Sequence, residues 1–381
     1  CFSPCDFVEC GRRFWFRGDY LLWWTKSAEL PPLVTTNPDN TTPQDEAGIL
    51  DADGTQILFG GGNANQGSRP GARFTFSFFP NCDDSSGIEI GYMFLSDKTA
   101  RYRATSQNGE TILARPFFDT GTNQQSAVLL AYTGVAQVSN IAVDFTNDFQ
   151  SLELLSRQAL YRDAGRRVDV LFGYRYARFA ERLSISHQFT NGPNGSDLVP
   201  VGAVIAGSEA FAGSNEFNGG EIGISAQTRH YRWSFEGLAK LALGGTRSRV
   251  SINGQTTVDY PSPGFEHFSR QGALLAQTTN IGLYSKDSFT AIPEVGVTVG
   301  FDITSRLKAT FGYSVVYWGQ VARPGDQIDV GKVAGSSVVN INSNPPSLAG
   351  DEPTGTPAPQ FRFTTTEFWA QGMNFGLDWR F

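Results

Sequence analysis

The last nine residues, 373–381, read MNFGLDWRF, and this stretch decides the fold class of the chain. Every second residue from Met373 to Phe381 is apolar, and the positions between them hold Asn374, Gly376, Asp378 and Arg380. Strict alternation of this kind is typical of a β-strand with one face in an apolar medium and the other in a polar one. The edge of such a strand needs a partner, so we looked for other segments with the same period.

Nine further segments alternate in the same way: FWFRGDYLLWW, RFTFSFF, GIEIGYMF, SLELLSR, RVDVLFGYRY, GEIGISAQ, YRWSFEGLAKLAL, PEVGVTVGF and LKATFGYSVVYW. Short connections, at about 80–86, 158–167, 228–230 and 303–306, alternate with long ones, at about 25–71, 97–148, 180–216, 244–290 and 319–368. Tight periplasmic turns that alternate with long outer loops are typical of an up-and-down barrel in an outer membrane. We therefore predict an all-β, antiparallel transmembrane barrel of about ten strands, within a range of eight to twelve. It forms one domain, 14–381, after an N-terminal periplasmic segment, 1–13.

The composition excludes two other classes of protein. A mean hydropathy of −0.24, without any run near the ~20 apolar residues of a spanning helix, excludes a helical membrane protein. A net charge of −7 disfavours nucleic acid as a partner, because its phosphates would repel this surface. A soluble β-sandwich would also alternate, but its buried face would be mainly aliphatic. Here Phe, Tyr and Trp crowd the apolar face near strand ends, as at membrane interfaces.

Two blocks of sequence resemble a known family. The first is Leu21-Leu22-Trp23-Trp24, followed by PPLVT at 31–35 and FGG at 59–61, and the second is RPGDQID at 323–329. Together with the aromatic terminus, these blocks resemble the planctomycete outer-membrane β-barrel porin family. The resemblance covers nearly the whole chain in the same order. It implies an outer-membrane barrel with its loops at the cell surface, and it defines no substrate.

Charged residues on the polar faces of the strands are predicted to line the lumen. Because ten strands enclose an interior only slightly wider than that of an eight-strand barrel, the charges either fill it as paired ions or line a path for ions or solutes. They are Arg17, Asp19, Arg73, Glu89, Glu153, Asp169, Arg175, Glu221, Arg232, Glu236, Lys240, Glu294, Lys308, Asp378 and Arg380.

The four cysteines, Cys1, Cys5, Cys10 and Cys82, all fall on the predicted periplasmic side. That compartment permits disulfides, and we expect a bridge from the N-terminal segment, from Cys10 or Cys5, to the turn at Cys82. Four cysteines allow three pairings, and the sequence does not choose among them. A first-residue cysteine also resembles the lipidated terminus of a processed bacterial lipoprotein. No CxxC motif or nearby histidine supplies the spacing of a metal site.

Catalysis is not expected, although some outer-membrane barrels are hydrolases. The three histidines are His187, His230 and His267, and no nucleophile motif lies near them. The DADG stretch at 51–54 lacks the later ligands of a calcium loop. We expect no cofactor, no metal and no catalytic residues. We predict a passive, non-catalytic outer-membrane barrel protein that is a porin-like, pore-forming or structural component of the cell envelope. The alternative function is a closed-barrel surface adhesin or a subunit of a larger outer-membrane assembly, and the remote alternative is an outer-membrane hydrolase.

The terminal segment also predicts partners. As the last strand it must pair with FWFRGDYLLWW to close the barrel, because hydrocarbon cannot satisfy bare backbone groups. Its Gly376, Trp379 and Phe381 resemble the signal that the barrel-assembly machinery recognises. The expected partners are therefore this machinery, outer-membrane lipid, and other copies of the chain or other envelope proteins.

Overall fold

The computed structural model describes residues 14–81, 84–261, 267–331, 335–340 and 357–381. Within these ranges the only helical element is a 3₁₀ turn, η1 (Gly325–Gln327). The strands are β1 (Phe14–Thr25), β2 (Ala28–Leu30), β3 (Val34–Thr36), β4 (Gln56–Phe59), β5 (Gly62–Ala64), β6 (Ser68–Phe78), β7 (Ser86–Ser106), β8 (Leu113–Asp119), β9 (Gln124–Ala131), β10 (Ala136–Arg162), β11 (Arg166–Asn191), β12 (Val204–His230), β13 (Trp233–Asp259), β14 (Phe268–Gln271), β15 (Gly282–Asp302), β16 (Leu307–Val321), β17 (Val338–Val339) and β18 (Thr366–Arg380).

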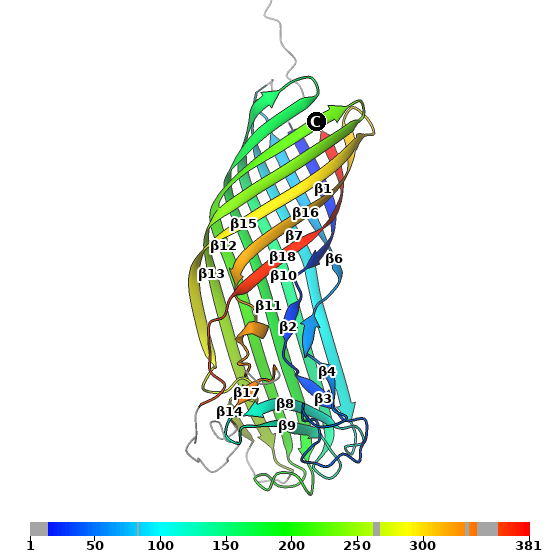
Figure 1. Cartoon of the computed structure of the whole chain (residues 1–381), viewed down its shortest axis with the longest axis vertical. Helices are drawn as coiled ribbons and strands as arrows, with labels where there is room; N and C mark the ends of the chain where they lie inside the picture. Colours follow the sequence, from blue (N-terminus) through cyan, green and yellow to red (C-terminus); the bar gives the residue numbers. More distant parts are fainter. Residues whose placement is uncertain (1–13, 82–83, 262–266, 332–334, 341–356) are drawn as a thin grey trace, which may run out of the picture.

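Ten strands form a closed antiparallel barrel, which confirms the predicted fold class (Figure 1). Their order is β12-β11-β10-β7-β6-β1-β18-β16-β15-β13, and pairing of β12 with β13 closes the sheet. The first and last strands of the chain lie side by side, with Trp15 opposite Arg380 and Thr25 opposite Ala370. The predicted seam between the two ends of the chain is therefore present. The four cysteines lie outside the described residues.

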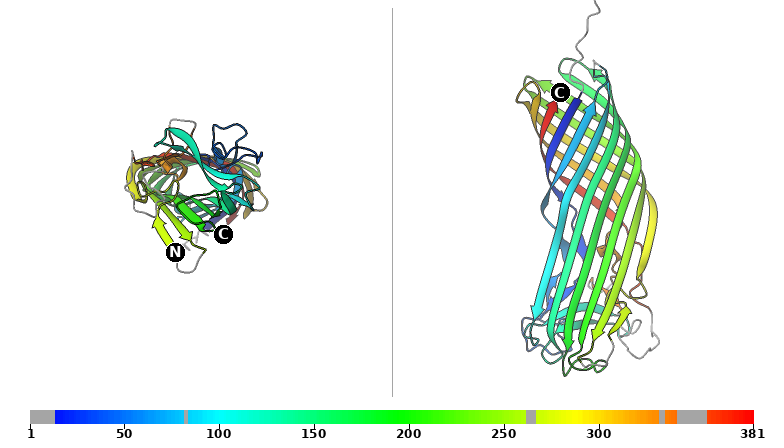
Figure 2. Two further views of the ribbon diagram at one scale, coloured as in Figure 1. Left: turned by 90° about the horizontal axis from the view of Figure 1, so that it is seen from below. Right: turned by 180° about the vertical axis from the view of Figure 1, so that it is seen from behind.

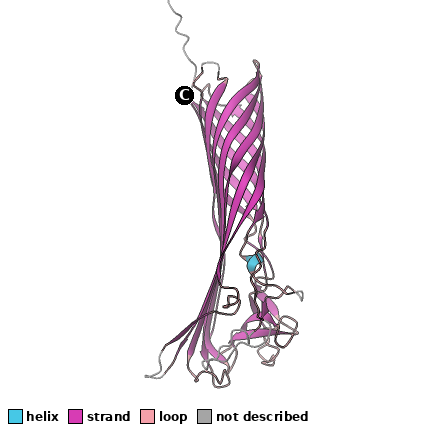
Figure 3. Ribbon diagram, turned by 90° about the vertical axis from the view of Figure 1, so that its left-hand side faces the viewer, coloured by secondary structure: helices cyan, strands magenta, loops and turns pink. Residues whose placement is uncertain are grey.

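The strands differ greatly in length, and this difference divides the molecule in two. The strand β10 has 27 residues, which at ~3.3 Å per residue is roughly three times the ~30 Å thickness of a hydrocarbon core. In contrast, β6 pairs with β7 only as far as Leu95, and β16 pairs with β15 only from Glu294 onward. The strands β7, β10, β11, β12, β13 and β15 therefore continue beyond the closed barrel as a curved sheet, which we call the wall (Figures 2 and 3).

The long strands correct three predicted loops. The segments 97–148, 180–216 and 244–290 were expected to be loop, but most of each is strand, and the connections at that end shorten to 107–135, 192–203 and 260–281. The apolar face changes sides along these strands. On β10 the exposed Leu152 and Leu154 face outward, whereas Phe145 and Phe149 are buried on the opposite face. A prediction based on one apolar face with a period of two does not detect this change of face. The strands were therefore predicted to end where the apolar face changes sides.

Inside the wall lies a small sheet built from the long connections. Its strands run in the order β17-β8-β3-β4, and β9 pairs with β8. Its Val34, Leu113 and Phe117 form one apolar core with wall residues such as Phe145 and Phe211. The concave face of the wall is therefore covered by the inner sheet, and Figure 3 shows the two facing each other at the end away from the C-terminus.

The closed half of the barrel carries an apolar band on its outside. The band is aromatic at many positions and includes Phe16, Phe76, Tyr92, Phe172, Tyr174, Trp233, Phe235, Phe311, Phe375 and Trp379, all more than a third exposed. Along the wall the outer face carries ion pairs instead, such as Arg178 with Asp148 and Arg249 with Glu216. An apolar band followed by charges is the surface that a membrane and its aqueous boundary require. No helix in the described residues is long and apolar enough to cross a membrane.

Candidate functional site

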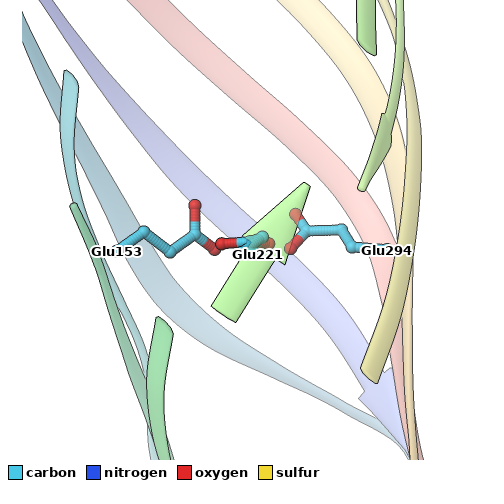
Figure 4. Close-up of side chains that lie close together, drawn as sticks. All are labelled: Glu153, Glu221 and Glu294. Atoms are coloured by element: carbon cyan, nitrogen blue, oxygen red, sulfur yellow. The ribbon is translucent and has the colours of Figure 1, made fainter. Parts of the chain in front are cut away.

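Six charged side chains meet in the middle of the closed barrel, one from each of six strands. We call them the charge cluster: Arg73, Glu153, Arg175, Glu221, Lys240 and Glu294. Arg175 is fully buried, and its Nη1 lies 2.9 Å from Glu294, 3.1 Å from Glu221 and 3.5 Å from Glu153. Figure 4 shows the three carboxylates converging from separate strands. They meet because inward positions at matching heights on neighbouring strands all carry charge.

Three cations balance three carboxylates in this cluster. Lys240 lies 2.5 Å from Glu153 and 3.3 Å from Glu294, and Arg73 lies 2.7 Å from Glu294. Burial of an ion is costly unless it is paired and hydrogen-bonded, and here every carboxylate has at least one cation in contact. One oxygen of Glu221 and one nitrogen of Arg175 are buried without a hydrogen-bond partner, so the match is close but incomplete.

The three carboxylates of the charge cluster are also near enough to one another to share a metal ion. An oxygen of each, from Glu153, Glu221 and Glu294, lies within 4.8 Å of the others. The same oxygens are already in contact with Arg175 and Lys240. The arrangement therefore suits an internal ion network better than a metal centre, because its positive charge is supplied by side chains.

An apolar layer lies directly beyond the charge cluster, on the side of the wall. Two residues beyond Arg175 on the same inward face stands Ala177, then Phe179, and beyond Lys240 stands Ala242. The layer contains Leu21, Trp23, Met93, Leu95, Phe149, Ala177, Phe179, Phe217, Ala242, Ile292, Val316, Trp318, Val321, Phe368 and Ala370, all buried. Phe179 and Phe368 stack with their ring centroids 4.1 Å apart. The members of this layer come from nine of the ten barrel strands and pack into one buried cluster.

Two pockets inside the barrel lie on the other side of the charge cluster, toward the end with the short turns. One cavity of about 60 Å³ is lined by Trp15, Arg17 and Lys240 among others. A wider hollow of about 230 Å³ follows at the rim, between Arg157, Asp378 and the turn residues 163–167. We call this charged open space, which extends from the charge cluster to the rim, the vestibule.

Most predicted lumen-facing charges do lie inside the barrel, in three groups. Six form the charge cluster. Arg17, Asp19 and Glu236 follow it, with Arg17 3.0 Å from Asp19 and 3.7 Å from Glu236. The third group lies nearest the rim: Glu89 and Asp169 each contact Arg157, at 2.9 and 2.8 Å, and Lys308 and Arg380 lie 3.8 and 3.9 Å from Asp378.

Arg232 does not line the lumen, so this prediction is wrong. It is exposed in the two-residue turn before β13 and donates hydrogen bonds of 2.8 Å to the carbonyl oxygens of Asp302 and Ile303. Its guanidinium lies over the ring of Phe301, 4.7 Å from the centroid. The alternation of the following strand does not extend to it, because β13 begins at Trp233.

The sequence prediction missed several buried charges. Arg157 shares the inward face of Glu153, four residues further along β10, so the same period would have identified it. Arg323 and Glu181, and Arg115 and Glu209, form buried pairs at 2.8 and 2.7 Å inside the wall. These four lie in segments that were predicted to be loops, and no local pattern marks their pairing.

The closed sheet, the outer apolar band and the buried charge cluster define a transmembrane β-barrel with an internal ion network. Family comparison makes the identification more specific. The model of the family described as "Putative beta barrel porin-7 (BBP7)" matches residues 15–381, and the chain belongs to this family.

Solved structures resemble the chain only distantly. The outer membrane protease OmpT from Escherichia coli is 10% identical, with a TM-score of 0.46 and coverage of 100% of this chain and 99% of that one. A FadL homologue from Pseudomonas aeruginosa is 7% identical, with a TM-score of 0.24 and coverage of 97% and 89%. The toluene transporter TbuX from Ralstonia pickettii is 8% identical, with a TM-score of 0.16 and coverage of 97% and 90%. No curated protein sequence matches the chain.

Proposed function

We propose that this protein is a passive, non-catalytic outer-membrane barrel with a closed lumen, which holds a folded domain beyond the membrane. The apolar layer around Phe179 and Trp318 carries the proposal, since it leaves the vestibule without an outlet. The charge cluster adds a second barrier, because its ions already satisfy one another and an ion in transit would have to displace them.

The wall and the inner sheet support a structural role. They share one core, which joins long connections from distant parts of the sequence to the barrel strands. Because the wall and the inner sheet share this core, we propose that their end of the molecule presents a fixed surface and not a set of mobile loops. We propose that it faces the cell surface, where it contacts other copies of the chain or other envelope proteins.

The proposed setting follows from the family and from the two sequence blocks. Membership in a β-barrel porin family and the apolar band support a bacterial outer membrane, reached through the barrel-assembly machinery. The blocks Leu21 to Trp24 and RPGDQID support a planctomycete source.

A conducting porin is the second candidate function, and the description of the family favours it. In that case the apolar layer and the charge cluster would act together as a gate. Conduction would require side chains from most barrel strands to leave the lumen. The two functions therefore differ in one measurable property, the ion conductance of the intact barrel.

Single-channel recording in planar bilayers distinguishes them. We expect no current steps from the wild-type chain. The double variant Phe179→Ala, Phe217→Ala removes two rings from the apolar layer and should produce leak events. A matched control, Phe172→Ala, removes an outward ring, 48% exposed, and should stay silent. Regular steps from the wild-type chain would refute the closed lumen. Heat-modifiable migration on gels would verify that each variant is folded.

A further inference from the structure

The outer face of the barrel changes from apolar to charged within one row of cross-strand neighbours. Tyr174 and Leu243 are exposed on the apolar band. The row that follows still carries exposed apolar side chains, Leu152 and Phe289. The next row reads, from β10 to β15, Gln150, Arg178, Glu216, Arg247 and Asp287, each directly opposite the next. Because this row borders the apolar band, it lies at the level of the lipid headgroups.

A shallow hollow of about 630 Å³ lies on the outer face beside this row. Three arginines line it, Arg178 and Arg182 on β11 and Arg249 on β13, together with the carboxylate of Asp148, which pairs with Arg178. Between them its floor is made of small side chains, Ala180, Ala212, Ser214 and Ser251. Small residues on the strands between long basic ones leave room for a bulky group to reach the guanidinium groups.

The three guanidinium groups keep unused hydrogen-bonding capacity. Arg178 donates through Nη1 to Asp148 at 2.9 Å, and Arg249 through Nη1 to both oxygens of Glu216 at 3.3 Å. Arg182 donates through Nε to Ser184 at 3.1 Å and has no carboxylate partner among the described residues. Each guanidinium carries five N–H donors, so most of them are open to a ligand.

We propose that this hollow binds the phosphate of a lipid headgroup in the leaflet at the end of the barrel that carries the wall. Phosphate suits a cluster of arginines, because each guanidinium can donate two parallel hydrogen bonds to it. The lipid, and not a soluble phosphate, is the ligand because the hollow borders the apolar band, where acyl chains cover the side chains of Tyr174 and its neighbours. The proposal depends on the position of the apolar band and is independent of whether the lumen is closed.

Electron paramagnetic resonance of spin-labelled lipids tests the proposal. The full chain is reconstituted in phosphatidylcholine vesicles, with a trace of spin-labelled phosphatidic acid or spin-labelled phosphatidylcholine. We expect the wild-type chain to immobilise phosphatidic acid preferentially. The double variant Arg178→Gln, Arg249→Gln should lower this relative association constant by about tenfold, since each basic residue near the surface contributes to headgroup binding.

The double variant Arg101→Gln, Arg103→Gln is the matched control. These arginines lie on the outer face of the same wall, paired with Asp144, but several rows further from the apolar band. The control should keep the wild-type preference for phosphatidic acid. Absence of that preference in the wild-type chain, or equal loss in both variants, would overturn the proposal. Excess inorganic phosphate added to the wild-type vesicles could also remove the preference for phosphatidic acid, as fully as the double variant does. That result would overturn the proposal in favour of a soluble phosphate ligand.

Discussion

Arg323 binds Glu181 through two hydrogen bonds of 2.8 Å, one from Nε and one from Nη2, with both side chains buried. The same guanidinium donates from Nη1 to the carbonyl oxygen of Ser27 at 2.8 Å. It thereby joins the wall to two connections that are about three hundred residues apart in the sequence. Next to it, Gly325 allows a close approach: a Cβ there would lie 2.3 Å from the carbonyl oxygen of Glu29.

Arg323→Gln should therefore loosen the domain inside the wall more than the barrel itself. Removal of one partner leaves Glu181 buried and unpaired, at an expected cost of about 3–5 kcal/mol. We expect faster protease cleavage in 26–67 and 322–365, with unchanged heat-modifiable migration of the barrel. Limited proteolysis followed by mass spectrometry checks this. Arg103→Gln, which breaks an exposed pair with Asp144, is the control and should cleave like the wild-type chain. Identical cleavage of both variants would contradict the role of Arg323.

The contrast between the two ends of the molecule explains how far the sequence was informative. In the closed barrel each strand keeps one apolar face against lipid, so a period of two identified the ten strands and most lumen charges, including Arg175 and Glu294. In the wall the apolar face turns inward, as at Phe145 and Leu183, and the outward positions become serine, alanine and paired ions. To predict the strands of the wall from a period of two, one must know where along each strand the membrane ends.

No local sequence pattern predicts the inner sheet or the buried ion pairs. Val34 and Phe117 share a core with Ile252, although each is more than one hundred residues away from it in the sequence. The resemblance in the RPGDQID block marked Arg323 as notable, but the partner at Glu181 could come only from the fold. Similarly, the sequence predicted that Glu153, Glu221 and Glu294 each face the lumen. No sequence pattern indicated that three cations would balance them.

Gly376 should tolerate no side chain, because the seam places it opposite Asp19. A Cβ at this position would lie 2.0 Å from Asp19 Oδ1 and 2.5 Å from Thr310 Oγ1. We expect Gly376→Ala to destabilise the barrel by about 1–3 kcal/mol, as overpacking does. Urea unfolding in lipid vesicles, followed by tryptophan fluorescence, measures the change. Gly237→Ala is the matched control, since a Cβ added there would have no atom within 4 Å. Equal stability of the two variants would show that the seam adjusts freely.

Arg175→Met should be among the most damaging substitutions in the closed barrel. It leaves Glu221 and Glu294 buried with fewer cations, and breaking a buried ion network in this way costs about 3–5 kcal/mol. The same urea unfolding assay should show this loss at neutral pH. Arg103→Met, in an exposed pair with Asp144 on the outer face of the wall, is the control and should change stability by less than ~1 kcal/mol. If Arg175→Met unfolds like the wild-type chain, the charge cluster does not hold the strands together.

Phe381→Ala should slow assembly more than it lowers stability. The ring of Phe381 is 58% exposed and stacks on Trp379 with a centroid distance of 5.7 Å, so it contributes little burial. Its backbone N–H donates to the carbonyl oxygen of Phe14 at 3.0 Å and would still do so in the variant. We expect less folded barrel in cells that use the assembly machinery, but near-normal unfolding in urea once folded. The control Phe375→Ala, 45% exposed in the same strand, should affect assembly less. A parallel loss in both variants would refute a terminal signal.

His187 should make the domain inside the wall sensitive to acid. Burial, together with the nearby Arg115 guanidinium, lowers the pKa of His187 to about 3, and its Nδ1 is buried without a hydrogen-bond partner. The unfolded chain therefore binds the proton more readily, so stability is full above pH ~6.5 and falls as the pH drops toward 3. At pH ~4.5 the loss should reach roughly 3 kcal/mol. Thermal unfolding at neutral pH and at pH ~4.5 should show a larger difference in stability for the wild-type chain than for His187→Gln, which cannot take up the proton.

The exposed His230 provides the control, because His230→Gln should retain the full acid sensitivity. Equal sensitivity in all three proteins would assign the effect to other groups.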